Sequence, residues 1–343
     1  MLRRSRVPVI AALTLALVVA AGTAAFASAP AQSQSGQVVV SGSSTVEPIT
    51  SLVGEKYSEK NPDVAVRVDG PGTGDGFQLF CNGETDISDA SRAIDEEEQQ
   101  ACQANGIAYT ELKVGIDGLS VITSKDTKVS CLNFNDLYAL IGPESQGFDN
   151  WQEAQPLATE LGSTTKLPKA KLEITAPGEE SGTYDSFIEI ALGDPAEKRV
   201  EAGKITEEQA ETTRKDYQSS GNDNTIIDGI AETKNSLGWV GFAFADQNKD
   251  KVKTIKVDNG EGGGCVADTR KTVQDGSYPL ARDLYIYVNN AKAASNRAVK
   301  SFVDFYMSKA GNTSVKESDY IQLPKASWTE SVNTWKAAAQ SLG

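Results

Sequence analysis

The sequence contains no histidine among its 343 residues. Histidine is the usual general base and a common metal ligand near neutral pH, so histidine-activated nucleophiles and histidine-rich metal sites are both excluded. Basic residues are also scarce, at 33 against 47 acidic residues, which leaves a net charge of −14. Such a chain offers no basic field to nucleic acids or anionic membranes. Most hydrolase mechanisms are therefore excluded and nucleic acid is disfavoured as a partner, and we expect neither a metal nor a cofactor.

The first residues have the features of a bacterial export signal. Three arginines among the first six residues precede an apolar run over 9–21, and Ala25-Phe26-Ala27 fits the small-x-small pattern of a cleavage site. This pattern predicts a signal peptide over 1–29; the alternative is an uncleaved anchor helix. No cysteine follows closely, so we expect no lipid anchor. The mature chain is expected in a periplasm or outside the cell, associated with the envelope.

The four cysteines are Cys81, Cys102, Cys131 and Cys265. An even number in an exported chain favours disulfides, and three pairings are open. We favour Cys81 with Cys102, which closes a short loop, and Cys131 with Cys265, which ties two distant segments. A structural metal site is the weaker alternative, because no pair has CxxC spacing and no histidine could complete the ligand set.

The mature part of the chain, roughly 310 residues, is long enough for two domains. An apolar strand at Val38-Val39-Val40 leads through a hydroxyl-rich turn into apolar residues at helical spacing that start at Val46. A second strand, 64–68, leads through the glycine-rich segment 70–76 into another helical stretch. Strands that alternate with helices in this way predict an α/β fold with mainly parallel sheets.

Two segments are expected to cross between the domains. Gly115-Ile116-Asp117-Gly118 interrupts the extended stretch 108–123, where glycine permits a bend. The segment 278–282 would carry the chain back. The predicted division is a signal peptide at 1–29, one lobe made of 37–116 with 283–343, and a second lobe at 117–282.

Three turns place serine, threonine and glycine where a helix is expected to begin. Unpaired N–H groups and the helix dipole favour anions at such positions, so local donors could overcome the unfavourable net charge. An ordinary N-cap explains any one turn alone, but three together favour an anion site. Arg92 follows a short strand and could clamp an oxyanion, or pair with Asp89 or Asp95 at the surface. The three turns are Gly42-Ser43-Ser44-Thr45, Gly72-Thr73-Gly74-Asp75-Gly76 and Gly178-Glu179-Glu180-Ser181-Gly182-Thr183.

The order of these motifs resembles the phosphate-binding, PstS-like proteins of phosphate ABC importers. The resemblance covers nearly the whole mature chain and includes the segment 273–282. It implies a type II periplasmic binding protein with two lobes, each a mixed and mainly parallel sheet flanked by helices, joined by a two-segment hinge. The motifs that carry it are Gly-Ser-Ser-Thr-Val at 42–46, Gly-Thr-Gly-Asp-Gly-Phe at 72–77, Asp-Ile-Ser-Asp-Ala-Ser-Arg-Ala-Ile at 86–94 and Glu-Ser-Gly-Thr-Tyr at 180–184.

The resemblance also implies which residues bind phosphate. Each would donate a hydroxyl or a backbone N–H to the anion. Carried over by position, they are Ser44, Thr45, Thr73, Ser181, Gly182 and Thr183.

Two positions depart from the best-known branch of the family. An aspartate of that branch falls where Ser91 stands, and an arginine falls where Pro177 stands. We expect Ser91 to contribute to the site and Arg92 to supply the positive charge. A carboxylate that accepts a proton from hydrogen phosphate would reject sulfate. Asp117 is the first candidate for this role and Asp75 the second; hydrogen bonding within the hinge or loop is the alternative for both.

The favoured function is capture of phosphate by a monomeric solute-binding protein that delivers it to the permease of an ABC importer. The same fold could instead bind sulfate or molybdate. A secreted hydrolase with Ser181 as nucleophile is disfavoured, because the Gly-x-Ser-x-Gly spacing and an activating histidine are both missing.

Overall fold

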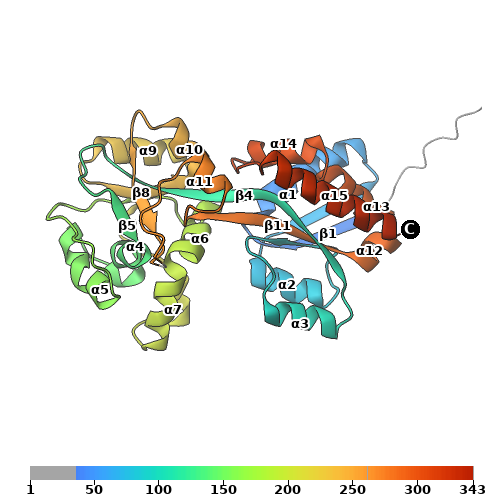
Figure 1. The fold of residues 1–343 in the computed structure, drawn as a ribbon, viewed down its shortest axis with the longest axis horizontal. Coiled ribbons are helices and arrows are strands. Elements are labelled where there is room, and N and C mark those ends of the chain that lie inside the picture. The colour runs from blue at the N-terminus through green and yellow to red at the C-terminus, as the bar shows by residue number, and fades with distance from the viewer. Residues whose placement is uncertain (1–35, 261, 343) are drawn as a thin grey trace, which may run out of the picture. The chain divides into compact units, whose positions relative to one another are not determined.

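The structure is a computed structural model that describes residues 36–260 and 262–342. The signal peptide predicted over 1–29 lies outside the described residues. Strands and helices alternate along the described chain, so the fold is α/β, as expected (Figure 1). None of the described helices combines the length and the apolar character needed to cross a bilayer.

The largest sheet has the strand order β2-β1-β3-β11-β4-β8, and β9 also pairs with β4. Two small sheets pair β10 with β5 and β6 with β7. The strand bounds are β1 Gly36–Gly42, β2 Val64–Asp69, β3 Ile87–Ala90, β4 Tyr109–Thr123, β5 Cys131–Asn133, β6 Thr175–Ala176, β7 Gln218–Ser219, β8 Leu237–Gly241, β9 Lys253–Thr254, β10 Lys256–Asp258 and β11 Ala281–Asn289.

The sheets are more mixed than the sequence predicted. β1 runs parallel to β2 and β3, and both small sheets are parallel. Every antiparallel pairing in the large sheet involves β4 or β11. These are the strands that connect the two groups of elements in Figure 1, so the antiparallel pairs come from the crossings.

Around the first half of the sheet, helices cover both faces. Leu284, Ile286 and Val288 of β11 pack into one apolar core, while the alternate residues Tyr285 and Tyr287 pack into another, as the two-residue period of a strand requires. The first of these cores lies under α1, α13 and α15, and the second lies under α2 and α3. The helices are α1 Glu47–Lys60, α2 Thr73–Cys81, α3 Glu96–Ala104, α12 Asn290–Ser295, α13 Arg297–Tyr306, α14 Lys309–Glu317 and α15 Lys325–Ser341.

A separate core fills the second half. Phe187 stacks on Trp239 with ring centroids 4.2 Å apart, and both rings are fully buried. Such a stack adds about 1 kcal/mol to the free energy of burial. A smaller core beside it holds the buried side chains of α9. The helices of the second half are α4 Phe134–Ile141, α5 Gln155–Glu160, α6 Gly182–Phe187, a π-helical turn Ile188–Leu192, α7 Gly193–Glu201, α8 Glu207–Ala210, α9 Asp223–Glu232, α10 Phe242–Gln247 and α11 Arg270–Gln274, with short 3-10 turns at Pro143–Ser145 and Trp151–Ala154.

The first crossing strand passes between the cores without a break. β4 runs from Tyr109 to Thr123 through both glycines of the predicted bend. Its pairing with β11 is irregular directly before Gly115, because Leu284 lies opposite Gly115 and Tyr285 opposite Lys113. The glycines also serve packing: a Cβ on Gly115 would lie 3.0 Å from Val315 Cγ1, and one on Gly118 would lie 3.0 Å from Val273 Cγ1. The predicted boundaries of the two lobes, at 116/117 and 282/283, are still a prediction.

Both favoured disulfides are present. Cys81 pairs with Cys102, and Cys131 pairs with Cys265, so the prediction of the pairing is confirmed. The first bond links α2 to α3, and the second fastens the start of β5 to a residue 134 positions later. Among the described residues no cysteine is free.

Candidate functional site

The turn after β1 is held tightly against β3. Gly42 has a φ of 152°, and a Cβ there would lie 2.0 Å from the backbone oxygen of Asp89, so only glycine fits. The N–H of Ser43 donates to that same oxygen at 2.9 Å. Ser44 and Thr45 follow before α1 begins, and their hydroxyls therefore project from a well-supported turn.

A second pair of hydroxyls comes from the start of α2 and the end of β3. Thr73 Oγ1 lies 2.9 Å from Ser91 Oγ and accepts from the N–H of Ser91 at 3.2 Å. A Cβ on Gly76 would lie 2.3 Å from Gly42 Cα, so α2 can begin this close to β1 only with glycine there. The close approach brings Thr73 beside the turn of Ser44.

On the other side of the site, α6 meets the same turn. Ser181 is the N-cap of α6 and accepts from the N–H of Thr183 at 3.2 Å. Gly182 packs against the backbone of Ser44 and Thr45, because a Cβ on it would lie 3.6 Å from the Ser44 oxygen. Two segments more than 130 residues apart are therefore in contact.

Two side chains of α6 bind hydroxyls of the turn after β1. Ser44 Oγ donates to Asp185 Oδ2 at 2.9 Å, and Thr45 Oγ1 lies 3.0 Å from Ser186 Oγ. Both bonds join a segment packed on the first cores to a segment packed on the second core. Burial raises the pKa of Asp185, and the hydrogen bond from Ser44 opposes that rise.

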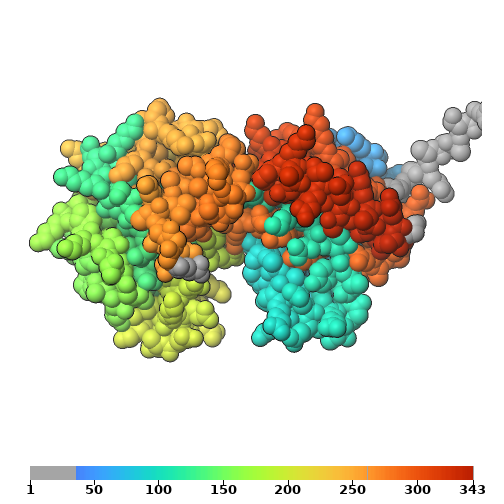
Figure 2. Space-filling view, in the orientation of Figure 1, coloured from blue at the N-terminus to red at the C-terminus, as the bar shows by residue number. Residues whose placement is uncertain are grey.

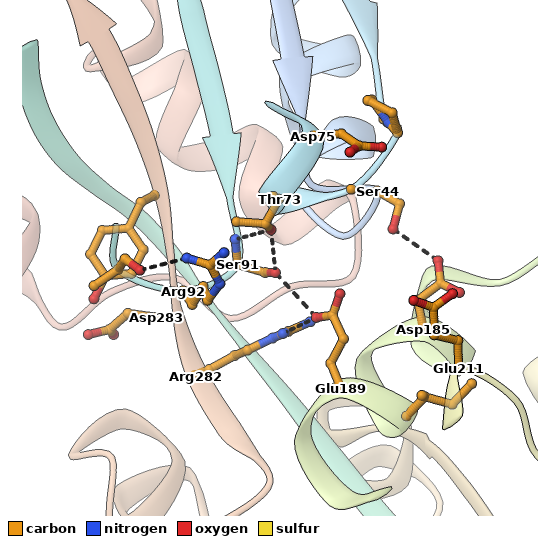
Figure 3. A pocket seen from close by; sticks show the side chains of 17 residues that line it. Ser44, Thr73, Asp75, Ser91, Arg92, Asp185, Glu189, Glu211, Arg282 and Asp283 are labelled. Carbon is orange, nitrogen blue, oxygen red and sulfur yellow. Dashed lines mark hydrogen bonds and ion pairs between the residues drawn. The ribbon is translucent and has the colours of Figure 1, made fainter. Parts of the chain in front are cut away.

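A cleft of about 910 Å³ lies beside these contacts. The space-filling view shows the surface hollowed below the crossing strands, between the residues of α3 and those of α7 (Figure 2). Neutral donors from Ser44, Thr73 and Ser91 line the cleft (Figure 3). Its charged lining consists of Arg92, Arg282, Asp75, Asp185, Glu189, Glu211 and Asp283.

Arg282 lies at the centre of the contacts between the two sides. It belongs to β11, and the strand register places it opposite Asp117 of β4. Its Nη2 donates to Thr45 Oγ1 at 3.2 Å and to Ser186 Oγ at 3.0 Å, and its Nη1 donates to Glu189 Oε2. Glu189 Oε2 also accepts from Ser91 Oγ at 3.4 Å. One guanidinium therefore joins the turn after β1, α6 and the π-helical turn; Figure 3 shows its pair with Glu189.

Arg92 lies at the rim of the cleft instead. Its two terminal nitrogens donate to both carboxylate oxygens of Glu98, at 2.8 and 2.7 Å, and its guanidinium lies 5.7 Å from the centre of the Phe77 ring. The Asp95 carboxylate is 3.6 Å away. The sequence left open a surface ion pair of Arg92 with Asp89 or Asp95. Arg92 does form a surface ion pair, and its main partner is Glu98.

Asp117 is almost completely buried behind Arg282. Its Oδ2 lies 3.5 Å from Arg282 Nε, and neither atom has a hydrogen-bond partner among the described residues. Burial raises the pKa of Asp117, while the charge of Arg282 lowers it. Asp75, the other candidate carboxylate, lines the open cleft.

The predicted residues fall into two neighbouring cavities. Ser44, Thr73, Ser91 and Arg92 line the large cleft. Asp117, Ser181 and Thr183 line a smaller cavity of about 200 Å³. Thr45 and Gly182 lie where the two sides touch. Among the described residues no cluster of three or more cysteine, aspartate or glutamate side chains could hold a metal ion.

Comparison with known proteins identifies the family. Residues 27–310 match a family described as "PBP superfamily domain". The chain belongs to the PBP superfamily. SphX of Synechococcus elongatus is 34% identical over 95% of this chain and 89% of its own length, and the phosphate-binding protein PstS of Staphylococcus saprophyticus is 33% identical over 86% and 83%.

A solved PBP structure supports the same placement. The crystal structure of "a possible phosphate binding protein" from Planctomyces limnophilus is 32% identical, with a TM-score of 0.79 over 89% of this chain and 99% of that one. The resemblance to PstS-like proteins is therefore confirmed. The staphylococcal and planctomycete relatives are both named for phosphate binding.

The sequence did not single out three residues that the structure places at the centre of this PBP site. They are Asp185, Glu189 and Arg282. Arg282 ends the segment expected to carry the chain back, and its position directly after that crossing was the available signal. Asp185 and Glu189 follow the Ser-Gly-Thr turn by three and seven residues, but nothing local indicated which way their side chains point.

Proposed function

We propose that this PBP protein captures inorganic phosphate in the cleft and delivers it to the permease of an ABC importer. The observation that carries the proposal is the convergence of hydroxyl donors from separate turns around a largely buried guanidinium. The names of the staphylococcal and planctomycete relatives point to the same ligand.

The donor set suits an oxyanion in an acidic protein. Hydroxyls and backbone N–H groups add no net charge but can satisfy an anion held out of water, where each hydrogen bond to a charged group is strong. We include all the predicted positions in the proposed site, because the family resemblance implies them and they line the two cavities or lie at the contact between the two sides. They are Ser44, Thr45, Thr73, Ser91, Arg92, Ser181, Gly182, Thr183 and Asp117, with Arg282 added.

The acidic lining favours phosphate over sulfate. Five carboxylates and two arginines line the cleft. Hydrogen phosphate can donate its proton to a carboxylate, whereas sulfate at neutral pH has no proton to donate and would be repelled by that carboxylate. A buried acceptor left unpaired can discriminate by about 10⁴-fold. Sulfate and molybdate remain the alternative ligands to test.

The proposal extends to location and partners. Two disulfides fit a compartment outside the cytoplasm. We propose an exported monomer that docks on membrane permease subunits, as the family resemblance implies.

Native mass spectrometry of the purified protein tests the proposal, followed by calorimetry with phosphate, sulfate and molybdate at fixed ionic strength. We expect a phosphate-sized mass on the protein and tight binding of phosphate alone. Tighter binding of sulfate or molybdate would replace phosphate as the proposed ligand and leave the protein an oxyanion-binding receptor. No binding of any oxyanion would sink the proposal.

A further inference from the structure

The two arginines of the cleft differ in exposure. The side chain of Arg92 is 43% exposed, and the forked pair with Glu98 already occupies both of its terminal nitrogens. The side chain of Arg282 is 15% exposed. Because screening by water and salt is weaker for a buried charge, Arg282 has the stronger local field.

The sheet fixes the position of Arg282. Backbone pairing of β11 with β4 sets Arg282 opposite Asp117, so the start of its side chain does not depend on loop geometry. The guanidinium then reaches Thr45 and Ser186, which come from the two sides of the site. The positive charge of Arg282 is therefore in contact with both sides of the site.

Glu189 uses the same donors that an oxyanion needs. Its carboxylate accepts from Arg282 Nη1 and from Ser91 Oγ. The side chain is 44% exposed and extends from the π-helical turn into the cleft, so it can swing out without unpacking a core. A carboxylate and a phosphate oxygen make equivalent demands on a guanidinium. An anion that reaches Arg282 therefore competes with Glu189.

We propose that Arg282 is the affinity-determining cation of this cleft and that phosphate binds by displacing the Glu189 carboxylate from it. The inference rests on the proposed function for its ligand, and on the contacts of Arg282, Glu189, Thr45 and Ser91 for its mechanism.

The test is calorimetry with inorganic phosphate on the full mature chain and four variants. Arg282→Gln should lower the affinity about 100-fold, and Arg92→Gln should lower it less than about fivefold. Glu189→Gln should raise the affinity about tenfold, because the competitor loses its charge. Glu197→Gln is the matched control: it removes the same charge from an exposed position on α7 and should change the affinity less than about twofold.

The outcomes separate the two proposals. If the wild type binds no phosphate, the proposed ligand is wrong, and the same variants are titrated with whichever oxyanion binds. If the wild type binds phosphate but Arg282→Gln binds it equally well, Arg282 has no such role. Lower affinity in Glu189→Gln would also overturn the inference, because it would make Glu189 a partner of the anion rather than a competitor. If circular dichroism shows that Arg282→Gln is unfolded, the affinity of Glu189→Gln for phosphate still decides the question.

Discussion

Two buried aspartates lie on strands close to the cleft and differ in one partner. Asp89 of β3 is fully buried, its Oδ1 accepts from Thr50 Oγ1 at 3.0 Å, and no lysine or arginine of the described chain forms an ion pair with it. Burial raises its pKa to about 8. Asp117 of β4 is buried to a similar degree, but Arg282 lies 3.5 Å away and opposes the rise in its pKa.

The difference shows what a counter-charge does to a buried carboxylate. Each aspartate has one oxygen, Oδ2, without a hydrogen-bond partner in the described part of the chain. Without a cation, Asp89 favours the neutral form and serves the fold, and its backbone oxygen also holds the turn after β1. Beside Asp117, Arg282 opposes the rise in the pKa of that carboxyl, and the carboxylate lies where it can orient the guanidinium. The same residue type therefore has a structural role at one strand and a positioning role at the other.

The largest effect should follow from removing the cation of Asp117. Arg282→Gln leaves a buried carboxylate unpaired, which should cost about 3 kcal/mol of unfolding free energy at pH 8. The pKa of Asp117 in the folded protein is already raised, and it should rise further. A raised folded-state pKa means stability that is present at low pH and lost as the pH rises from about 4, so the loss should be smaller at pH 5. Urea unfolding at both pH values measures this.

A double-mutant cycle checks the cause. Asp117→Asn combined with Arg282→Gln removes both charges, so the double variant should be more stable at pH 8 than Arg282→Gln alone. Glu189 and Tyr320 are the other titratable groups that act on Asp117, and both are unchanged in the cycle. Equal pH dependence in the wild type and in Arg282→Gln would mean that Arg282 does not control Asp117.

The second prediction concerns Asp89, where no cation is present to remove. Asp89→Asn eliminates the ionisation that the folded protein resists. The wild type should lose stability as the pH rises from about 4 towards 8, because the unfolded chain releases the proton earlier. The variant should lack this loss, so its stability relative to the wild type should improve by on the order of 2–3 kcal/mol between pH 5 and pH 8.

Asp63→Asn provides the control for Asp89→Asn, because Asp63 is exposed before β2. Its stability relative to the wild type should be nearly independent of pH. Glu47 and Tyr306 also influence Asp89 and remain in place in both variants. A parallel pH profile for Asp89→Asn and the wild type would show that Asp89 is not neutral in the folded protein.

The sequence predicted most of the fold because the local patterns were strong. Apolar residues at helical spacing placed α1, and the short apolar run at Val38 placed β1. The apolar run from Gly238 to Phe244 spans two elements, because β8 ends at Gly241 and α10 begins at Phe242. A short apolar run does not distinguish a buried strand from the first turn of a buried helix, so that boundary depended on packing.

The site was predictable only in its turns. Hydroxyls at helix starts are a local signal, and Ser44, Thr73 and Ser181 lie on the turns where they were expected. The role of Arg282 depends on the register of β11 against β4, which sets residues 165 positions apart side by side. Arg92 was the expected cation because it follows a strand, but its partner Glu98 comes from the next helix. Only the tertiary structure therefore shows which groups the charged side chains of the site pair with.

The prediction with the smallest expected effect concerns the hydrogen bond that Thr50 donates to Asp89. Thr50 Oγ1 donates to Asp89 Oδ1 and lies 3.0 Å from the Tyr306 hydroxyl. Thr50→Val removes this donor with little change in volume and should cost about 1 kcal/mol, because one buried acceptor loses its bond. The cost should grow as the pH rises, since the donor favours the ionised carboxylate. In the Asp89→Asn background the cost should not vary with pH. A cost of Thr50→Val that is equally insensitive to pH with Asp89 intact would show that the hydroxyl supports Tyr306 rather than the charge of Asp89.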